Sequence, residues 1–243
     1  MIFDLRPKSL ESKALNNTRT FSALVVSEQV ICDIMESEQV MKTGTTTVAV
    51  LCKDGVILGA DRRATMGTFI ADTKSEKIHQ ISDSMGLTTA GTVSDIQLLV
   101  KLIKAELKLK HIRTYREADL KEAANLLSGM IYGNIRKFSI IPGLSHFLLG
   151  GRDDKGFHIY DLFVDGSLTE VPDYVSSGSG SVFAYGVLET LYKKDMTIKE
   201  GTNLVVSALS AALKRDSASG NGVTIVTITK DGYKKILEKE VPT

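Results

Sequence analysis

The chain has 243 residues, of which 43% are apolar and 24% are charged, and this is enough to build one sizeable globular domain. Its 30 basic and 29 acidic residues leave a formal net charge of +1, which argues against electrostatic binding of nucleic acid. Cys32 and Cys52 are expected to be free thiols, and neither they nor the four scattered histidines have the spacing of a metal site, so we expect no cofactor.

Residues 1–43 are mixed in composition and weakly patterned, with some apolar periodicity over 25–35 that suits a short helix or strand. The most apolar stretch, 21–35, is too short and too charged to span a bilayer and lacks the basic start of a signal peptide. We therefore expect a cytoplasmic protein without a membrane partner. Two interpretations of this segment stay open: a propeptide that is removed, or an over-long gene start whose true first residue is Met35 or Met41.

The next part of the chain combines β-rich stretches with two helical patterns. Strands are expected over 45–53, 55–61, within 69–81 and at 87–91, and helices over 94–112 and 119–138. The sequence Lys53-Asp54-Gly55 between the first two strands is typical of a tight turn.

The last hundred residues again have strands followed by two helices, and they end with two more strands. Strands are expected over 147–150, 156–164, 222–230 and 233–237, helices over 181–192 and 197–214, and turns at Gly150-Gly151, Asp165-Gly166 and Lys230-Asp231-Gly232. Strands, two helices, strands, two helices and strands do not alternate as in a doubly wound parallel sheet. The order favours an α+β fold, a four-layer αββα sandwich of two antiparallel sheets flanked by helix pairs. We expect residues 45–243 to form a single domain.

A short run, Gly44-Thr45-Thr46-Thr47-Val48-Ala49-Val50, opens this domain. Taken alone, consecutive threonines suit the start of an edge strand. Five later blocks change that interpretation: Asp61-Arg62-Arg63-Ala64-Thr65, Lys77, Thr89-Ala90-Gly91-Thr92, Ser176-Ser177-Gly178-Ser179-Gly180-Ser181 and Arg215-Asp216-Ser217-Ala218-Ser219-Gly220. In their order and spacing, from Gly44 to about Leu237, the sequence resembles the β subunits of the archaeal 20S proteasome, which are threonine peptidases with the fold of N-terminal nucleophile (Ntn) hydrolases. Residues 1–43 do not share the resemblance.

Elementary chemistry explains why a threonine would stand at such a position. A hydroxyl is a poor nucleophile until a base takes its proton, and a free α-amine, with a pKa of ~7.7–8.0, is a suitable base. Thr45 has that amine only after the Gly44–Thr45 bond is broken. Gly44 has no Cβ and so suits the tight turn that brings the Thr45 hydroxyl onto the preceding carbonyl. The resemblance implies autocatalytic cleavage between Gly44 and Thr45, with residues 1–44 as leader and 45–243 as the catalytic domain.

The resemblance also implies roles for other residues. Lys77 would lie beside the nucleophile, held by Asp61, with Arg63 extending the network, and the Gly91 N–H would stabilise an oxyanion. Ser179, Asp216 and Ser219 would surround the terminal amine. The implied catalytic residues are therefore Thr45, Asp61, Lys77, Gly91, Ser179, Asp216 and Ser219.

Plainer explanations remain open for each of these residues. Asp61 and Lys77 would suit a surface ion pair, Gly91 a strand end, and Ser179 a helix N-cap. Residues 216–220 would suit the turn that follows a helix.

For the substrate, the resemblance implies an extended peptide lying beside Thr65 and residues 91–93. The first specificity pocket would be lined by Ala64, Ser75, His79, Thr89, Val93 and Gln97. Since no fixed counter-charge is evident among them, we expect hydrophobic substrate side chains rather than acidic or strongly basic ones.

The resemblance implies an assembly as well. Seven β subunits would form a ring, two such rings would stack, rings of α subunits would cap them, and an ATPase regulator would deliver unfolded polypeptide. Three alternatives stay open: a catalytically silent structural subunit that keeps its leader, an Ntn amidase for small molecules, and the bacterial two-ring homologue. The Ser-Gly-Ser-Gly-Ser and Arg-Asp-Ser-Ala-Ser-Gly blocks argue against the last of these.

Overall fold

The computed structural model describes residues 44–139 and 142–240. The helix or strand expected over 25–35 lies outside these ranges, as does the expected leader apart from Gly44.

The described residues form twelve strands and four helices. In chain order these are β1 (Thr47–Cys52), β2 (Gly55–Asp61), β3 (Ala64–Met66), β4 (Phe69–Asp72), β5 (Ile78–Ser82), β6 (Met85–Gly91), α2 (Val93–Thr114), α3 (Leu120–Ile135), β7 (Ser145–Asp153), β8 (Gly156–Leu162), β9 (Leu168–Val171), β10 (Tyr174–Ser177), α4 (Ser181–Leu191), α5 (Ile198–Arg215), β11 (Val223–Thr229) and β12 (Gly232–Lys239).

Two five-stranded antiparallel sheets form the centre of the fold. One has the order β10-β1-β2-β11-β12 and the other β5-β6-β7-β8-β9, while β3 and β4 pair only with each other. Cys52 pairs with Gly55, so Lys53 and Asp54 form the expected tight turn between β1 and β2. Because β11 pairs with β2, the end of the chain completes the sheet that its beginning started.

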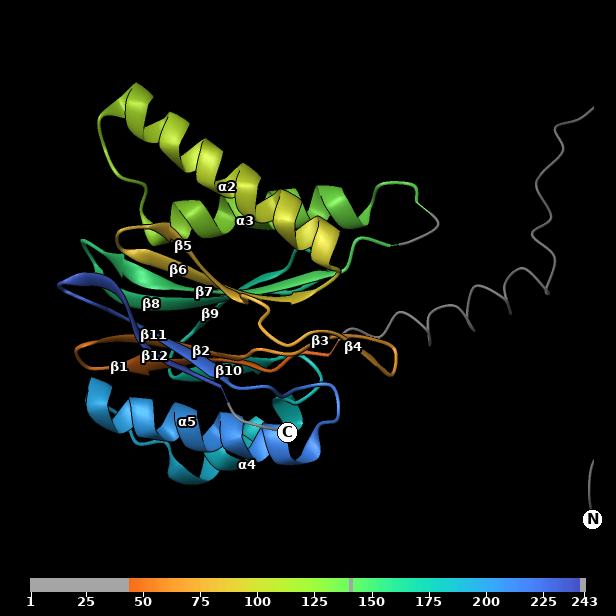
Figure 1. Cartoon of the computed structure of the whole chain (residues 1–243). Coiled ribbons are helices and arrows are strands. Elements are labelled where there is room, and N and C mark those ends of the chain that lie inside the picture. Colours follow the sequence, from red (N-terminus) through yellow and green to blue (C-terminus); the bar gives the residue numbers. More distant parts are fainter. Residues whose placement is uncertain (1–43, 140–141, 241–243) are drawn as a thin grey trace, which may run out of the picture. The chain divides into compact units, whose positions relative to one another are not determined.

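The sheets stack face to face with one helix pair outside each (Figure 1). Helices α2 and α3 cover the sheet that contains β7, and α4 and α5 cover the sheet that contains β1. The four-layer αββα sandwich predicted from the sequence is therefore confirmed.

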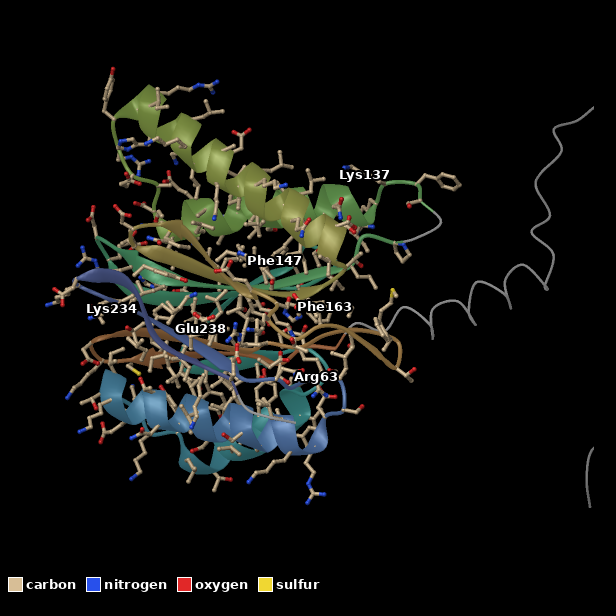
Figure 2. All side chains as sticks on the ribbon, in the orientation of Figure 1. Arg63, Lys137, Phe147, Phe163, Lys234 and Glu238 are labelled. Carbon is tan, nitrogen blue, oxygen red and sulfur yellow. The ribbon has the colours of Figure 1, made fainter. Side chains whose placement is uncertain are left out.

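Three clusters of buried apolar side chains fill the interfaces between these layers (Figure 2). Successive side chains of a strand point to opposite faces, which β2 shows clearly. Ile57 packs among the residues of α5, whereas Val56 and Leu58 pack between the two sheets. Every residue of β2 is buried as a result. The packing of this central strand therefore fixes the position of the polar residue at its end, Asp61.

The turn expected at Gly150-Gly151 is a wrong prediction, because both glycines lie inside β7. Their role is close packing rather than chain reversal. A Cβ on Gly150 would stand 2.7 Å from Val56 Cγ1, across the space between the sheets, and one on Gly151 would stand 2.6 Å from the carbonyl oxygen of Ser84. The chain reverses four residues later, where Asp153 pairs with Gly156.

The second helix is also shorter than expected, ending at Ile135 rather than at residue 138. Arg136 leaves the helical region and its N–H bonds only as far back as Asn134. Among the described helices, none is both long enough and apolar enough to cross a membrane.

Candidate active site

Thr45 lies just before β1, and its hydroxyl points back at the residue that precedes it. Its Oγ1 donates a hydrogen bond to the Gly44 carbonyl oxygen at 2.7 Å, while the Gly44 N–H donates to Thr65 Oγ1 at 2.7 Å. A Cβ on Gly44 would come within 1.8 Å of Ala218 Cβ, so only glycine fits this turn. The sequence folds here so that the Thr45 hydroxyl and the peptide bond before it are held together.

A buried ion pair lies beside the same carbonyl group. Lys77, just before β5, donates from Nζ to Asp61 Oδ1 at 2.6 Å and to the Gly44 oxygen at 3.4 Å. Asp61 and Lys77 are only 1% and 5% exposed, so the plainer explanation of a surface pair does not apply. Burial lowers the pKa of Lys77, and the Asp61 carboxylate opposes that change. An ammonium group at this place polarises the Gly44 carbonyl.

Asp61 also ties three backbone segments together. Its Oδ1 accepts the N–H of Thr46 at 2.9 Å, and its Oδ2 accepts the N–H groups of Arg63 at 3.0 Å and Gly220 at 3.1 Å. One carboxylate therefore fixes the start of β1, the end of β2 and the loop after α5. A carboxylate with this many donors is held in a single orientation.

A second network lies on the nitrogen side of Thr45. The Thr45 N–H donates to Ser179 Oγ at 3.3 Å, and the hydroxyls of Ser179 and Ser219 each donate to Asp216 Oδ2 at 2.6 Å. Thr46 Oγ1 and Ser219 Oγ are 2.7 Å apart, which joins this network to β1.

The local backbone explains how Ser179 reaches Thr45. Gly178 has a φ of 93°, and a Cβ there would lie 2.1 Å from the Thr45 carbonyl oxygen. The N-cap of α4 is Gly180, not Ser179, so the Ser179 hydroxyl is available to Asp216. Asp216 is the C-cap of α5, so the turn expected after that helix and the contact with Ser179 occur together.

Arg63, labelled in Figure 2, braces the loop that carries Asp216 and Ser219. Its guanidinium donates to Asn221 Oδ1 at 2.7 Å and to the Ser217 carbonyl at 2.9 Å. Thr46 and Asn221 were not predicted as site residues. A Thr run and an Asn-Gly turn carry no signal of their own, because their role depends on a loop that is distant in sequence.

Gly91 ends β6 with a φ of 127°, in a region that favours glycine. A Cβ at this position would stand 2.2 Å from the Leu144 carbonyl oxygen. The glycine therefore lets the end of β6 pass close to the backbone of Leu144, just before β7.

A cavity of about 470 Å³ opens beside Thr45 and Gly91. All seven residues predicted to bind substrate line it, namely Ala64, Thr65, Ser75, His79, Thr89, Val93 and Gln97. Asp72, the last residue of β4, and Glu76, in the segment before β5, line it too. Neither was predicted, because their place in the cavity depends on the three-dimensional path of the chain and not on a local pattern.

Outside this region, a larger cavity of about 610 Å³ lies between α2 and the loop before α3, and none of the predicted site residues lines it. Within the described ranges, no group of His, Cys, Asp or Glu side chains is arranged to hold a metal ion.

Comparison with known proteins gives a consistent result. The family described as Proteasome subunit matches residues 41–228. The chain is 46% identical over 198 residues to a proteasome subunit beta of Archaeoglobus profundus, which covers 82% of this chain and 90% of that protein. It is also 46% identical over 207 residues to the proteasome subunit beta of Methanohalophilus mahii, covering 85% and 96% of the two chains, and 46% identical over 198 residues to that of Methanothrix thermoacetophila, covering 82% and 94%.

Proposed function

The chain belongs to the proteasome subunit family as a 20S β subunit, and from this premise we propose that it is a catalytically active one, a threonine endopeptidase. The observation that carries the proposal is the contact between the Thr45 hydroxyl and the Gly44 carbonyl, with Lys77 beside it. A subunit with only a structural role has no need for this arrangement.

The first step that we propose is removal of the leader, residues 1–44. Thr45 Oγ attacks the Gly44 carbonyl carbon, the Gly44–Thr45 amide bond breaks, and the acyl group passes from nitrogen to oxygen. Water then hydrolyses the resulting ester, which leaves a Gly44 carboxylate and a free α-amine on Thr45. The positive charge of Lys77 supports the developing oxyanion, which forms on the same oxygen that Lys77 now contacts.

The freed amine then serves as the base in peptide hydrolysis. It takes the proton of its own Oγ as that oxygen attacks a substrate carbonyl, and the Gly91 N–H stabilises the oxyanion. The amine next protonates the leaving nitrogen, and an ester to Thr45 remains until water releases it. Ser179 and Asp216 hold the amine, since Ser179 already contacts the nitrogen of Thr45.

We further propose that the substrate is unfolded polypeptide, bound as an extended strand beside Thr65 and residues 91–93. The side chain on the acyl side of the cleaved bond would enter the cavity next to Thr45. The mixture of small and neutral residues there supports acceptance of apolar side chains.

We also propose assembly into stacked β rings that are capped by α rings and served by an ATPase regulator. Exposed apolar side chains support the part of this proposal that requires contact with other subunits. On β3 and β4, Met66 and Phe69 are 62% and 65% exposed, and on α4 Val182 is 74% exposed. Apolar side chains gathered on short elements in this way are typical of surfaces that other subunits cover. The buried free thiol of Cys52 suits the reducing cytoplasm in which we propose that the particle works.

The silent structural subunit and the small-molecule amidase are the competing functions. The complete set of Thr45, Asp61 and Lys77 disfavours a silent subunit. Hydrolysis of short acyl-amides in preference to unfolded protein would favour the amidase.

The test compares Thr45→Ala with Thr45→Ser in the assembled particle. Alanine removes the nucleophile, so leader removal should stop and peptide hydrolysis should fall by about 10⁴-fold or more. Serine keeps a hydroxyl on the same backbone and should retain both reactions at a lower rate, because it lacks the β-methyl group that restricts χ1. Intact mass and hydrolysis of an unfolded protein are the measurements.

Circular dichroism should show the same fold in both variants. If Thr45→Ala loses the leader normally, the cut belongs to another active site. If that variant still degrades the substrate, Thr45 is not the nucleophile.

A further inference from the structure

The cavity beside Thr45 contains one histidine, His79, whose side chain is only partly exposed. In the part of the chain that the structure describes, no hydrogen bond or ion pair engages its ring. The imidazole thus contributes to the cavity wall a group that can donate, accept or carry a positive charge. The other uncharged polar residues of the wall cannot change their charge in this way.

Two charged groups act on His79, and they come from different parts of the chain. Glu76, in the segment before β5, raises the pKa of the His79 ring, and Lys104 on α2 lowers it, but burial has the largest effect and lowers it. On β6, the residue paired with His79 is the uncharged Leu87. The pKa of the ring is therefore lowered below the ordinary 6.5 of histidine, so the ring is neutral at neutral pH and takes up its proton only on acidification.

The other charged groups of the cavity supply no free positive charge that could take the place of a protonated His79 ring. The Lys77 ammonium is already paired with the Asp61 carboxylate at 2.6 Å. Asp72 and Glu76 are exposed carboxylates, so at neutral pH the cavity presents negative charge and a neutral imidazole. A substrate carboxylate entering the cavity meets repulsion under these conditions.

We propose that His79 sets the charge preference of this cavity: a neutral ring admits uncharged side chains and disfavours acidic ones, and a protonated ring accepts Asp or Glu at the cleaved bond. The inference rests on the proposed peptidase function. Cleavage after acidic residues, promoted by acidification, would then be a second specificity of the same site.

The experiment uses the assembled particle and two peptide substrates that differ only in Glu or Gln on the acyl side of the cleaved bond. Glu and Gln have nearly the same shape, so the ratio of their kcat/KM values isolates charge. Titration of the Thr45 amine affects both substrates equally and cancels in that ratio. We expect the Glu/Gln ratio to rise about fivefold between about pH 8 and about pH 5, an effect of about 1 kcal/mol.

Two variants identify the group responsible. In His79→Gln, a neutral side chain replaces the ring, so the ratio should stay nearly flat, with only a small rise at the lowest pH where the substrate Glu begins to take up its own proton. In Glu76→Gln, the ring loses a carboxylate that favours its charged form, so the rise should persist but shift to lower pH.

A flat ratio in the unaltered particle, or an equal rise in His79→Gln, overturns the inference while leaving the peptidase function intact. If neither substrate is hydrolysed and unfolded protein is also untouched, the proposed function fails and the inference falls with it.

Discussion

The carboxylate of Asp216 links Thr45, the proposed nucleophile, to the end of a helix. Its Oδ2 accepts hydrogen bonds from both Ser179 and Ser219, and its Oδ1 accepts the N–H of Ala218 at 3.2 Å. Ser179 in turn accepts the N–H of Thr45. After leader removal, that nitrogen becomes the proposed base, and the negative charge of Asp216 lies one hydroxyl away from it.

We predict that Asp216→Asn lowers the pH at which activity appears. A nearby carboxylate favours the protonated amine, so its loss should lower the pKa of the Thr45 amine by up to about one unit. The acidic limb of the kcat/KM profile should then move to lower pH, together with a lower maximal rate because Ser179 is less well oriented. The measurement is the pH dependence of peptide hydrolysis by the processed particle. If the acidic limb of the profile does not move, Asp216 does not act on the pKa of the Thr45 amine and only holds the local backbone in place.

Single residues also show where sequence reasoning succeeds and where it fails. The blocks around Asp61, Lys77 and Asp216 have a characteristic spacing, so their resemblance to the family identified residues that the fold brings together. Asp72 and Glu76 have no such pattern, and only the three-dimensional path of the chain places them in the cavity. The roles of all these residues stay predictions until they are tested by substitution.

At the scale of elements, α3 shows how local chemistry begins a helix. The Glu122 carboxylate accepts the N–H of Asp119, the N-cap residue, at 2.9 Å. It also receives Arg116 at 2.8 Å and Lys110 of α2 at 2.7 Å. The Arg116 hydrogen bond, followed by that of Lys110, lowers the pKa of Glu122 from 4.5 to about 2. One side chain therefore caps α3 and attaches it to α2.

We predict that Glu122→Gln lowers the free energy of unfolding by about 1 kcal/mol near neutral pH, a modest value because solvent screens a carboxylate that is more than a third exposed. A lowered pKa gives stability that is fully present above pH 4.5 and lost as the pH falls towards about 2. The difference from the unaltered chain should therefore shrink over that range. Denaturant unfolding of the precursor subunit at several pH values is the measurement.

Glu106→Gln is the matched control, since Glu106 is exposed on α2 and has no ion pair among the described residues. It should change stability little at any pH. A Glu122→Gln effect that matches this control, or that persists undiminished near pH 3, would contradict the account of the α3 cap.

The long helices and strands were predicted from the sequence, and most of the short strands were not. All four helices appeared where apolar residues recur at helical spacing, and the long strands appeared where β-rich runs end at tight turns. Strands β3, β9 and β10 were missed because each has only three or four residues, too few for alternation to show. In β10, Ser176 and Ser177 pair with Val48 and Thr47 and lie at the edge of a sheet, although neither residue had been assigned to a strand.

At the scale of the domain, the sandwich brings the ends of several strands to one site. Thr45 precedes β1, Asp61 ends β2, Gly91 ends β6 and Gly178 follows β10, although these residues are distant in sequence. Three apolar clusters hold the layers that carry them, so strands packed in the core fix one side of the site, and the loop after α5 supplies Asp216 and Ser219. The order of elements was sufficient to predict the layers. The pairing of β11 with β2, which brings the loop after α5 to Asp61, could not be predicted from local sequence patterns.

The central claim is that the working subunit begins at Thr45 with a free amine. The most direct measurement is the intact mass of the β subunit, together with its N-terminal sequence, in assembled particles that degrade unfolded protein. We predict a chain of residues 45–243 that starts with an unmodified threonine. Active particles whose β subunits still carry the leader, or whose Thr45 amine is acylated, would contradict the account.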